Sequence, residues 1–369
     1  LFNAISEAAI PTLADWAALS SADFQARRAA GGSERLADVQ ALVLAFAETG
    51  RVPEDLLTSA MAAVRLRGDL MDAASGTAAC PKVKLKMNQA VPKILLEVPQ
   101  VLEDRPDLCV LWKPPGWTVS VGNSEDDDEQ FGASSGEGAF VGLGEPLQQW
   151  VAQELGPSCP IARDSGAQYG LLHRLDRETS GAILCAKTYV GYHTAQLAFA
   201  AGKVCKDYLC LCHGRLEPGP RLIDTPLRME APVPGKPFVR RSVACRGAET
   251  GGRPSRTEVL SVVVLRTTSG EEVSLAELRL QTGRMHQIRA HLSSEGHPLV
   301  GDVAYGGNQR PWCPRIFLHA SHLRISLDED NSLDVNTDLP PDLQQALGQL
   351  ECTDAASKAM RGKWLRERG

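Results

Sequence analysis

The sequence lacks the features of several large classes of protein. No apolar run in its 369 residues approaches the about 18 residues of a membrane-spanning helix, so we expect no membrane association. It has no P-loop and no Gly-x-Gly-x-x-Gly fingerprint, which argues against a nucleotide cofactor. The ten cysteines are scattered without a Cys-x-x-Cys pair, a usage more typical of a reducing compartment than of a disulfide framework.

The histidines also lack the spacing of a metal site. His286 and His291 are five residues apart, and no His-Glu-x-x-His motif occurs. Cys210 and Cys212 fall on one side of a predicted strand beside His213, but a second pair of ligands is missing. We therefore expect neither a metal nor any other cofactor, and a metal-dependent hydrolase is only a third alternative.

What the sequence does have is an uneven distribution of charge. The formal net charge is -6, yet residues 171–327 carry 21 basic and 13 acidic side chains together with all eight histidines. A basic region inside an acidic protein is typical of a surface that binds a polyanion such as RNA. The alternative is that these charges simply face solvent.

Residues 1–71 are predicted to form a small helical extension. Val39, Val43 and Phe46 fall on one face of a first helix, and a second helix opens after Pro53 and ends at Gly68. These two helices form a predicted hairpin. A helical repeat of the kind that binds RNA is an alternative, but only one unit is visible. Residues 72–98 have the composition of a linker.

Residues 99–328 are predicted to form one α+β domain, and residues 329–369 a C-terminal tail. Strands and helices alternate without a regular βαβ rhythm, which argues against a doubly wound sheet. An acidic Gly/Ser-rich insertion at 122–142 is predicted to be a surface segment. A calcium site in its acidic run is the alternative, but the alternating ligand spacing is absent. The elements expected in the domain are strands at 108–112, 182–186, 208–212, 257–266 and 273–280 and helices at 147–155 and 189–201.

The stretch from His173 to Gly181 is the strongest candidate for chemistry. It places Asp176 between Arg174 and Arg177 in a tight loop before an apolar strand. Neighbouring guanidinium groups can hold such a carboxylate ionised and aim it at a substrate. Taken alone, the loop is better explained as a turn capped by Asp176 and Thr179 with solvated arginines.

Two further segments offer partners for this carboxylate. Arg284 follows a Thr-Gly pair at a strand–helix junction, where it is predicted to form a bidentate pair with Asp176. A structural ion pair without a chemical role is the alternative. Tyr208, in the predicted strand that begins near Lys206, offers a flat face to a base and a hydroxyl for hydrogen bonding or proton transfer.

Taken together and in order, these motifs resemble the RluA-type RNA pseudouridine synthases. The resemblance spans residues 99–328 and leaves the first 98 residues and the last 40 or so outside it. The motifs that carry it are Lys113-Pro114-Pro115-Gly116, His173-Arg174-Leu175-Asp176 with Thr179-Ser180-Gly181, Lys206-x-Tyr208, Thr282-Gly283-Arg284-x-His286-Gln287-Ile288-Arg289, Gly296-His297-Pro298-x-x-Gly301-Asp302-x-x-Tyr305-Gly306 and Leu318-His319-Ala320.

This resemblance implies a mixed, largely antiparallel sheet and the isomerisation of uridine in RNA to pseudouridine without a cofactor. Asp176 would initiate cleavage of the C1′–N1 bond, and the freed uracil would rejoin the ribose through C5. The target uridine would be flipped out of its stack, and Arg174 would fill the vacated space. The predicted catalytic residues are Asp176, Arg284 and Tyr208, and the predicted substrate-binding residues are Arg174, His173, Thr179, Lys206, His286 and Arg289.

The sequence leaves the substrate open among transfer, ribosomal and messenger RNA, and we expect a monomer. The chain begins at Leu1 and not at Met, so the true N-terminus is expected to be missing or processed. Any targeting segment would then be invisible, and an intracellular site in the cytoplasm or an organelle is left open. The runner-up function is a catalytically inactive RNA-binding protein on the same fold. The presence of Asp176, Arg284 and Tyr208 argues against that loss of activity.

Overall fold

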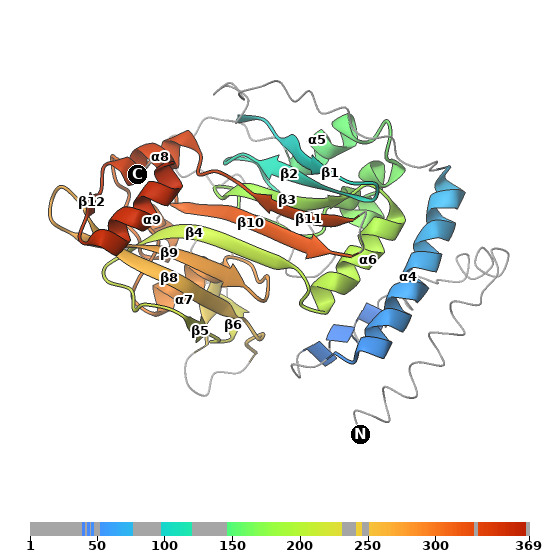
Figure 1. Cartoon of the computed structure of the whole chain (residues 1–369), viewed down its shortest axis with the longest axis horizontal. Coiled ribbons are helices and arrows are strands. Elements are labelled where there is room, and N and C mark those ends of the chain that lie inside the picture. Colours follow the sequence, from blue (N-terminus) through green and yellow to red (C-terminus); the bar gives the residue numbers. More distant parts are fainter. Residues whose placement is uncertain are drawn as a thin grey trace, which may run out of the picture.

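The computed structural model is organised around one large mixed sheet (Figure 1). It describes residues 39–40, 43–44, 46–47, 52–76, 97–119, 146–230, 241–245, 251–327 and 331–366. The sheet has ten strands. Their order is β1 (Gln100–Asp104), β2 (Leu108–Lys113), β3 (Ser180–Ala186), β10 (Leu318–Ser326), β4 (Cys205–His213), β9 (Glu272–Leu280), β8 (Thr257–Arg266) and β12 (Glu351–Cys352), with β11 (Ser332–Asn336) on β10 and β5 (Arg221–Ile223) on β8.

The pairing of these strands is almost entirely antiparallel. Within the described residues, β3 and β10 form the one parallel pair of the sheet. The five strands predicted from apolar runs are confirmed as β2, β3, β4, β8 and β9. Strands β2 and β3 are buried at every position, which explains why their sequences are apolar throughout and do not alternate. A separate two-stranded sheet pairs β6 (Leu227–Met229) with β7 (Ser242–Ala244).

Helices cover both faces of the sheet. The larger core packs helices against strands β2, β3, β4 and β10, and a second core lies between β4, β8, β9 and the C-terminal helices. The mixed sheet with helices segregated around it confirms the α+β class. The described helices are α4 (Glu54–Ser75), α5 (Leu147–Glu154), α6 (Tyr189–Ala200), α7 (Gln287–Ser294), α8 (Pro341–Gly348) and α9 (Ala355–Leu365), with short 3-10 turns at Pro160–Arg163 (η2), Ser165–Gly170 (η3) and Val303–Tyr305 (η4). In the part of the chain that the structure describes, none of these helices combines the length and apolarity needed to cross a membrane.

Most cysteines in the described residues serve as small core residues. Eight are free thiols and six of these are buried, while Cys159 is disulfide-bonded. The acidic insertion predicted at 122–142 lies outside the described residues.

Residues 329–369 were predicted as a tail, but the described part of this segment, residues 331–366, belongs to the same sheet and core. Strand β11 pairs with β10 over five positions, and β12 pairs with β8. Leu343 and Leu347 of α8 are fully buried against β4 and β9. The prediction failed because it took the end of the sequence resemblance at 328 as the end of the domain, whereas the apolar side chains that close this core come later.

The helical extension packs directly on helix α6 of the α+β domain. The described positions of its first predicted helix are helical, and Val43 is buried against Leu56 and Val64 of α4. The apolar face of α4 then closes on Leu197 of α6, and the two helices run side by side (Figure 1). Asp72 of α4 caps α6, because its carboxylate accepts from the backbone N–H groups of Tyr189 (2.9 Å) and Val190 (3.1 Å).

The predicted end of α4 at Gly68 is wrong. The helix continues to Ser75, and Gly76 provides the left-handed residue that ends it, so residues 72–75 belong to a helix and not to a linker. Gly68 instead permits close approach of the two helices. A Cβ at this position would lie 2.4 Å from the Cα of Val190 in α6.

Replacing Gly68 should therefore destabilise the protein despite the higher helix propensity of alanine. We expect Gly68→Ala to lower the free energy of unfolding by about 1–3 kcal/mol, because α4 must move away from α6. Gly348→Ala in α8, where nothing lies within 4 Å of the new Cβ, is the matched control and should be neutral or stabilising by up to about 1 kcal/mol. Urea denaturation measures both, and equal effects would contradict the close approach.

Candidate active site

The loop that carries Asp176 is held by a buried lysine. Lys113, the last residue of β2, is fully buried. Its Nζ donates to the carbonyl oxygens of Thr179 (2.7 Å), Pro114 (3.0 Å) and Arg177 (3.1 Å). Burial and the charge of Arg315 lower the pKa of Lys113 to about 7. The loop closes on itself through a turn in which the Thr179 N–H donates to the Asp176 carbonyl oxygen at 3.0 Å.

Arg315 holds the same loop from the other side. Its guanidinium donates to the Glu178 carbonyl oxygen (2.8 Å) and the Ser180 hydroxyl (3.0 Å), and pairs with Asp342 of α8 at 2.6 Å. The C-terminal segment therefore helps to position the loop. Sequence reasoning missed Arg315, because a single arginine before an apolar strand carries no recognisable signal.

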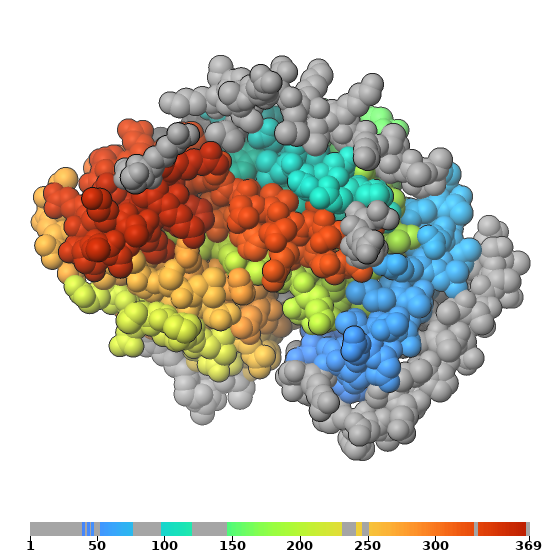
Figure 2. Space-filling view, viewed as in Figure 1, coloured from blue at the N-terminus to red at the C-terminus, as the bar shows by residue number. Residues whose placement is uncertain are grey.

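Asp176 opens into a cavity of about 650 Å3. Its walls come from the loop, the end of α6, the start of β4 and the segment at 280–289. Figure 2 shows a hollow between the blue extension and the orange strands, the two parts of the chain that flank this cavity. Among the described lining residues, Asp176 is the only carboxylate, whereas Arg174, Lys206, Arg284 and Arg289 are basic. The cavity therefore suits an anionic ligand that approaches one negatively charged side chain.

The partner of Asp176 is Arg289 and not Arg284. Arg289, on α7, lies 3.3 Å from Asp176 through Nη1 and binds both oxygens of the fully buried Asp302 at 2.7 and 2.9 Å. Arg284 instead donates from Nε to the Pro254 carbonyl oxygen at 3.2 Å. The bidentate pair predicted for Arg284 is therefore corrected. Arg284 lies in the turn before α7, while Arg289 lies one helical turn inside and faces the loop.

This environment favours the ionised form of Asp176. Burial alone raises the pKa of the carboxyl group, but the charges of His286, Arg289 and Arg174 and the hydrogen bond from Arg289 lower it by more, so the pKa lies below its ordinary value. Burial also lowers the pKa of His286. The permanent charges of Arg289 and Arg174 act on Asp176 whatever the protonation state of His286.

His286 occupies a constrained position beside Asp176. Its φ of 50° places a non-glycine residue in the left-handed region, which such residues seldom adopt. Nε2 lies 3.9 Å from Asp176, and Nδ1 lies 3.1 Å from the hydroxyl of Tyr305. Gln287, the next residue, accepts from the Arg284 N–H and donates to the Arg256 carbonyl oxygen. The turn that carries His286 is thereby fixed to β8.

Strand β4 directs Tyr208 and Lys206 into the cavity. Both side chains are buried there. Burial and the charges of Asp176 and Asp207 raise the pKa of Tyr208, so its hydroxyl stays protonated over the physiological range. Burial lowers the pKa of Lys206 to about 8, and its Nζ lies 5.4 Å from the centroid of the Phe199 ring.

The other predicted residues surround Asp176 as well. Arg174 and Thr179 line the cavity. His173 also lines it, but its Nε2 accepts from the Leu184 N–H at 2.9 Å. Burial and the charge of Lys206 lower the pKa of His173 to about 3, so the ring is neutral and fixes the loop to β3.

The helical extension contributes one wall of the cavity. Gln40 and Leu44 line the cavity, and Gln40 Nε2 donates to Oε1 of Gln196 on α6 at 2.8 Å. Leu44 is 46% exposed, although large apolar side chains are usually covered. The extension was predicted as a separate domain because an apolar pattern predicts a helix but does not identify the surface against which that helix packs.

Comparisons with known proteins point to one family. The sequence model described as RNA pseudouridylate synthase matches residues 107–294. The chain is 35% identical over 153 residues to the uncharacterized RNA pseudouridine synthase YhcT of Bacillus subtilis, an alignment that covers 42% of this chain and 46% of YhcT. It is 32% identical over 185 residues to RNA pseudouridylate synthase domain-containing protein 1 of Danio rerio, covering 50% of this chain and 62% of that protein.

A similar solved structure is human RNA pseudouridylate synthase domain containing 1, with 24% identity and a TM-score of 0.48 over 76% of this chain and 98% of that chain. The chain spans about half the length of the curated relatives that it matches. The family match covers the loop of Asp176, strand β4 and helix α7. The chain therefore belongs to the RNA pseudouridylate synthase family, as its resemblance to the RluA-type enzymes predicted.

Proposed function

We propose that this protein isomerises specific uridines in RNA to pseudouridine, with Asp176 as the catalytic carboxylate. The observation that carries the proposal is a single ionised carboxylate in a cavity otherwise lined by basic, apolar and neutral polar groups. Four basic side chains around it suit the phosphates that flank a flipped nucleotide. Family membership makes uridine in RNA the expected substrate.

In the proposed reaction, Asp176 acts on the ribose of the flipped uridine and the C1′–N1 bond breaks. The freed uracil rotates in the cavity, and C5 forms a new bond to C1′. C5 then loses its proton while N1 gains one, so the composition of the nucleotide does not change. The reaction is an isomerisation and consumes no co-substrate.

The side chains around Asp176 suit separate parts of this reaction. Arg289 keeps the carboxylate ionised and oriented through Asp302. Tyr208 offers an aromatic face to the turning base, and because its pKa is raised, its hydroxyl acts as a neutral hydrogen-bonding group and not as a phenolate. Arg174 is the residue proposed to occupy the space that the flipped base leaves. Arg284 and Lys206 are proposed to hold phosphate groups.

Asp176→Asn tests the central claim. We expect conversion of uridine to fall by at least about a thousandfold, because the amide cannot attack the ribose or accept its proton, while RNA binding changes little. Pseudouridine is mapped by carbodiimide modification in a mixture of unmodified transfer and ribosomal RNA transcripts. Asp224→Asn, which changes an exposed carboxylate outside the cavity, is the control and should keep full activity. Full activity in Asp176→Asn would exclude the mechanism, and RNA binding without turnover in the unaltered protein would favour the inactive alternative.

Arg289→Lys and Arg284→Lys distinguish the roles of the two arginines. Lysine cannot bridge Asp302 and Asp176 together, so in Arg289→Lys the pKa of Asp176 should rise. Because the enzyme is active only while Asp176 is ionised, the acid limb of the pH–rate profile should move to higher pH, and kcat should fall about tenfold to a hundredfold. Arg284→Lys should raise KM and leave the acid limb in place. The same shift in both variants would contradict the assignment of Arg289 as the partner.

The wall formed by the extension should take part in RNA recognition. Leu44→Glu places a negative charge at the rim, and we expect KM for RNA to rise about fivefold to thirtyfold with kcat nearly unchanged. Leu222→Glu is the control, because Leu222 is 45% exposed but lies outside the cavity. Equal KM values for the two variants would remove the extension from the binding site.

A further inference from the structure

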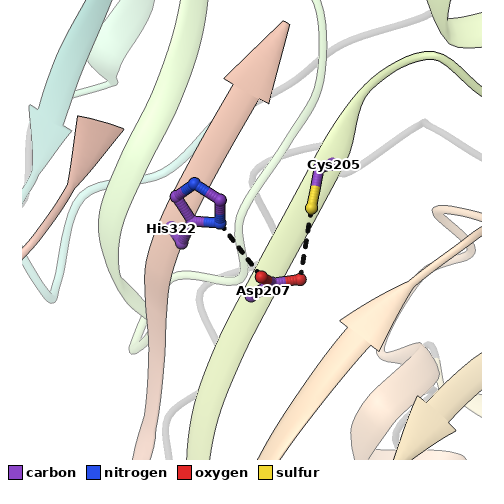
Figure 3. Close-up of side chains that lie close together, drawn as sticks. All are labelled: Cys205, Asp207 and His322. Atoms are coloured by element: carbon purple, nitrogen blue, oxygen red, sulfur yellow. Dashed lines mark hydrogen bonds and ion pairs between the residues drawn. The ribbon is translucent and has the colours of Figure 1, made fainter. Parts of the chain in front are cut away.

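A second cluster of chemically active side chains lies on the opposite face of β4. Successive side chains of a strand alternate between faces, so Cys205 and Asp207 lie away from the cavity that Lys206 and Tyr208 enter. His322 of β10 lies directly across from Asp207 in the strand pairing, as Figure 3 shows. All three side chains are partly buried, and their potential ligand atoms lie within 4.8 Å of one another.

The spacing of these atoms suits a small cation. The sulfur of Cys205 lies 3.4 Å from Oδ1 of Asp207, and Nδ1 of His322 lies 3.0 Å from Oδ2 (Figure 3). Ligands about 2.0–2.3 Å from a tetrahedral zinc ion lie roughly 3.3–3.8 Å from one another. Only small side-chain shifts are therefore needed to bring the three atoms around one ion.

The ring of His322 lies between two carboxylates. Nδ1 lies 3.0 Å from Oδ2 of Asp207, and Nε2 lies 2.7 Å from Oδ1 of Asp334. A metal ion bound to Nδ1 would be shared with Asp207, while the other ring nitrogen keeps its contact with Asp334.

We propose that Cys205, Asp207 and His322 bind a divalent transition metal ion of the zinc type. Ions of this type bind thiolate, imidazole and carboxylate ligands, whereas calcium and magnesium ions prefer oxygen ligands alone. Asp334 accepts from the far N–H of His322, which is the arrangement that commonly orients a metal-bound histidine. On binding, the sulfur of Cys205 exchanges its proton for the metal and the proton passes to solvent. Water fills the fourth position.

Arg279 sets the limit on the affinity of this site. It pairs with both oxygens of Asp207 at 2.6 and 2.9 Å. A carboxylate has about four acceptor positions, so those that face Cys205 and His322 stay available, but the nearby guanidinium repels a cation. A metal at this site would join β4 to β10 beside the register shift between Ala320 and His322. Its role would be to fix the strand that carries Tyr208.

Cobalt(II) binding to the purified full-length chain tests the proposal independently of any activity on RNA. We expect one cobalt ion per chain, a thiolate-to-cobalt charge-transfer band in the near ultraviolet, and displacement of cobalt by zinc. Zinc should also raise the melting temperature in proportion to the logarithm of its concentration.

Variants assign the ligands. Cys205→Ser should abolish the charge-transfer band, and His322→Gln should weaken cobalt binding at least about tenfold. Arg279→Gln should tighten binding, because it removes the competing positive charge. Cys352→Ser, which alters the other partly exposed thiol in the described residues, should behave like the unaltered chain. The absence of the band in the unaltered chain, or its survival in Cys205→Ser, would overturn the proposal.

Discussion

The buried guanidinium of Arg289 is the interaction on which the site depends. It lies between Asp302, which is fully buried, and Asp176, which faces the cavity. Removing one partner from such a network leaves an uncompensated charge in a region of low dielectric, so the three side chains act as a unit. Arg289 comes from α7, Asp302 from the turn before η4, and Asp176 from the loop before β3. The position of the Asp176 carboxylate therefore depends on how three distant segments pack together.

The same loop is fixed from behind by two further cations. Lys113 binds its carbonyl groups from β2, and Arg315 binds them from the start of β10. Because Arg315 also pairs with Asp342, the last part of the chain contributes to the rigidity of the loop. Positive charge thus both supports the loop and surrounds its carboxylate.

The sequence predicted the elements better than their contacts. Apolar runs gave β2, β3, β4, β8 and β9, since burial on both faces leaves a signal in consecutive residues. The end of α4 was misplaced because Gly68 serves close packing, a role that looks the same in sequence as a helix stop. Asp176 was predicted from its motif, but its ion-pair partner was predicted to be Arg284, whereas the structure has Arg289 in that place. The choice between two arginines five residues apart depends on where α7 begins.

Contacts that depend on strand pairing could not be predicted from the sequence either, because the residues that meet are far apart in the chain. His322 is 115 residues from Asp207, and only the alignment of β10 with β4 brings them together. A search for closely spaced ligands along the chain finds nothing at this place. The wall formed by Gln40 and Leu44 is a similar case, because it depends on how α4 lies on α6.

The packing of α4 on α6 also has a consequence for synthesis on the ribosome. The extension is made before α6, yet its apolar face includes contacts with Leu197. Its helices therefore emerge more than a hundred residues before the surface that covers them, with Leu56 and Val64 exposed during that interval. The extension is the first part of the described chain to be translated, yet it can reach its final packing only once α6 has been made. By then the loop that carries Asp176 has already been translated, because this loop precedes α6.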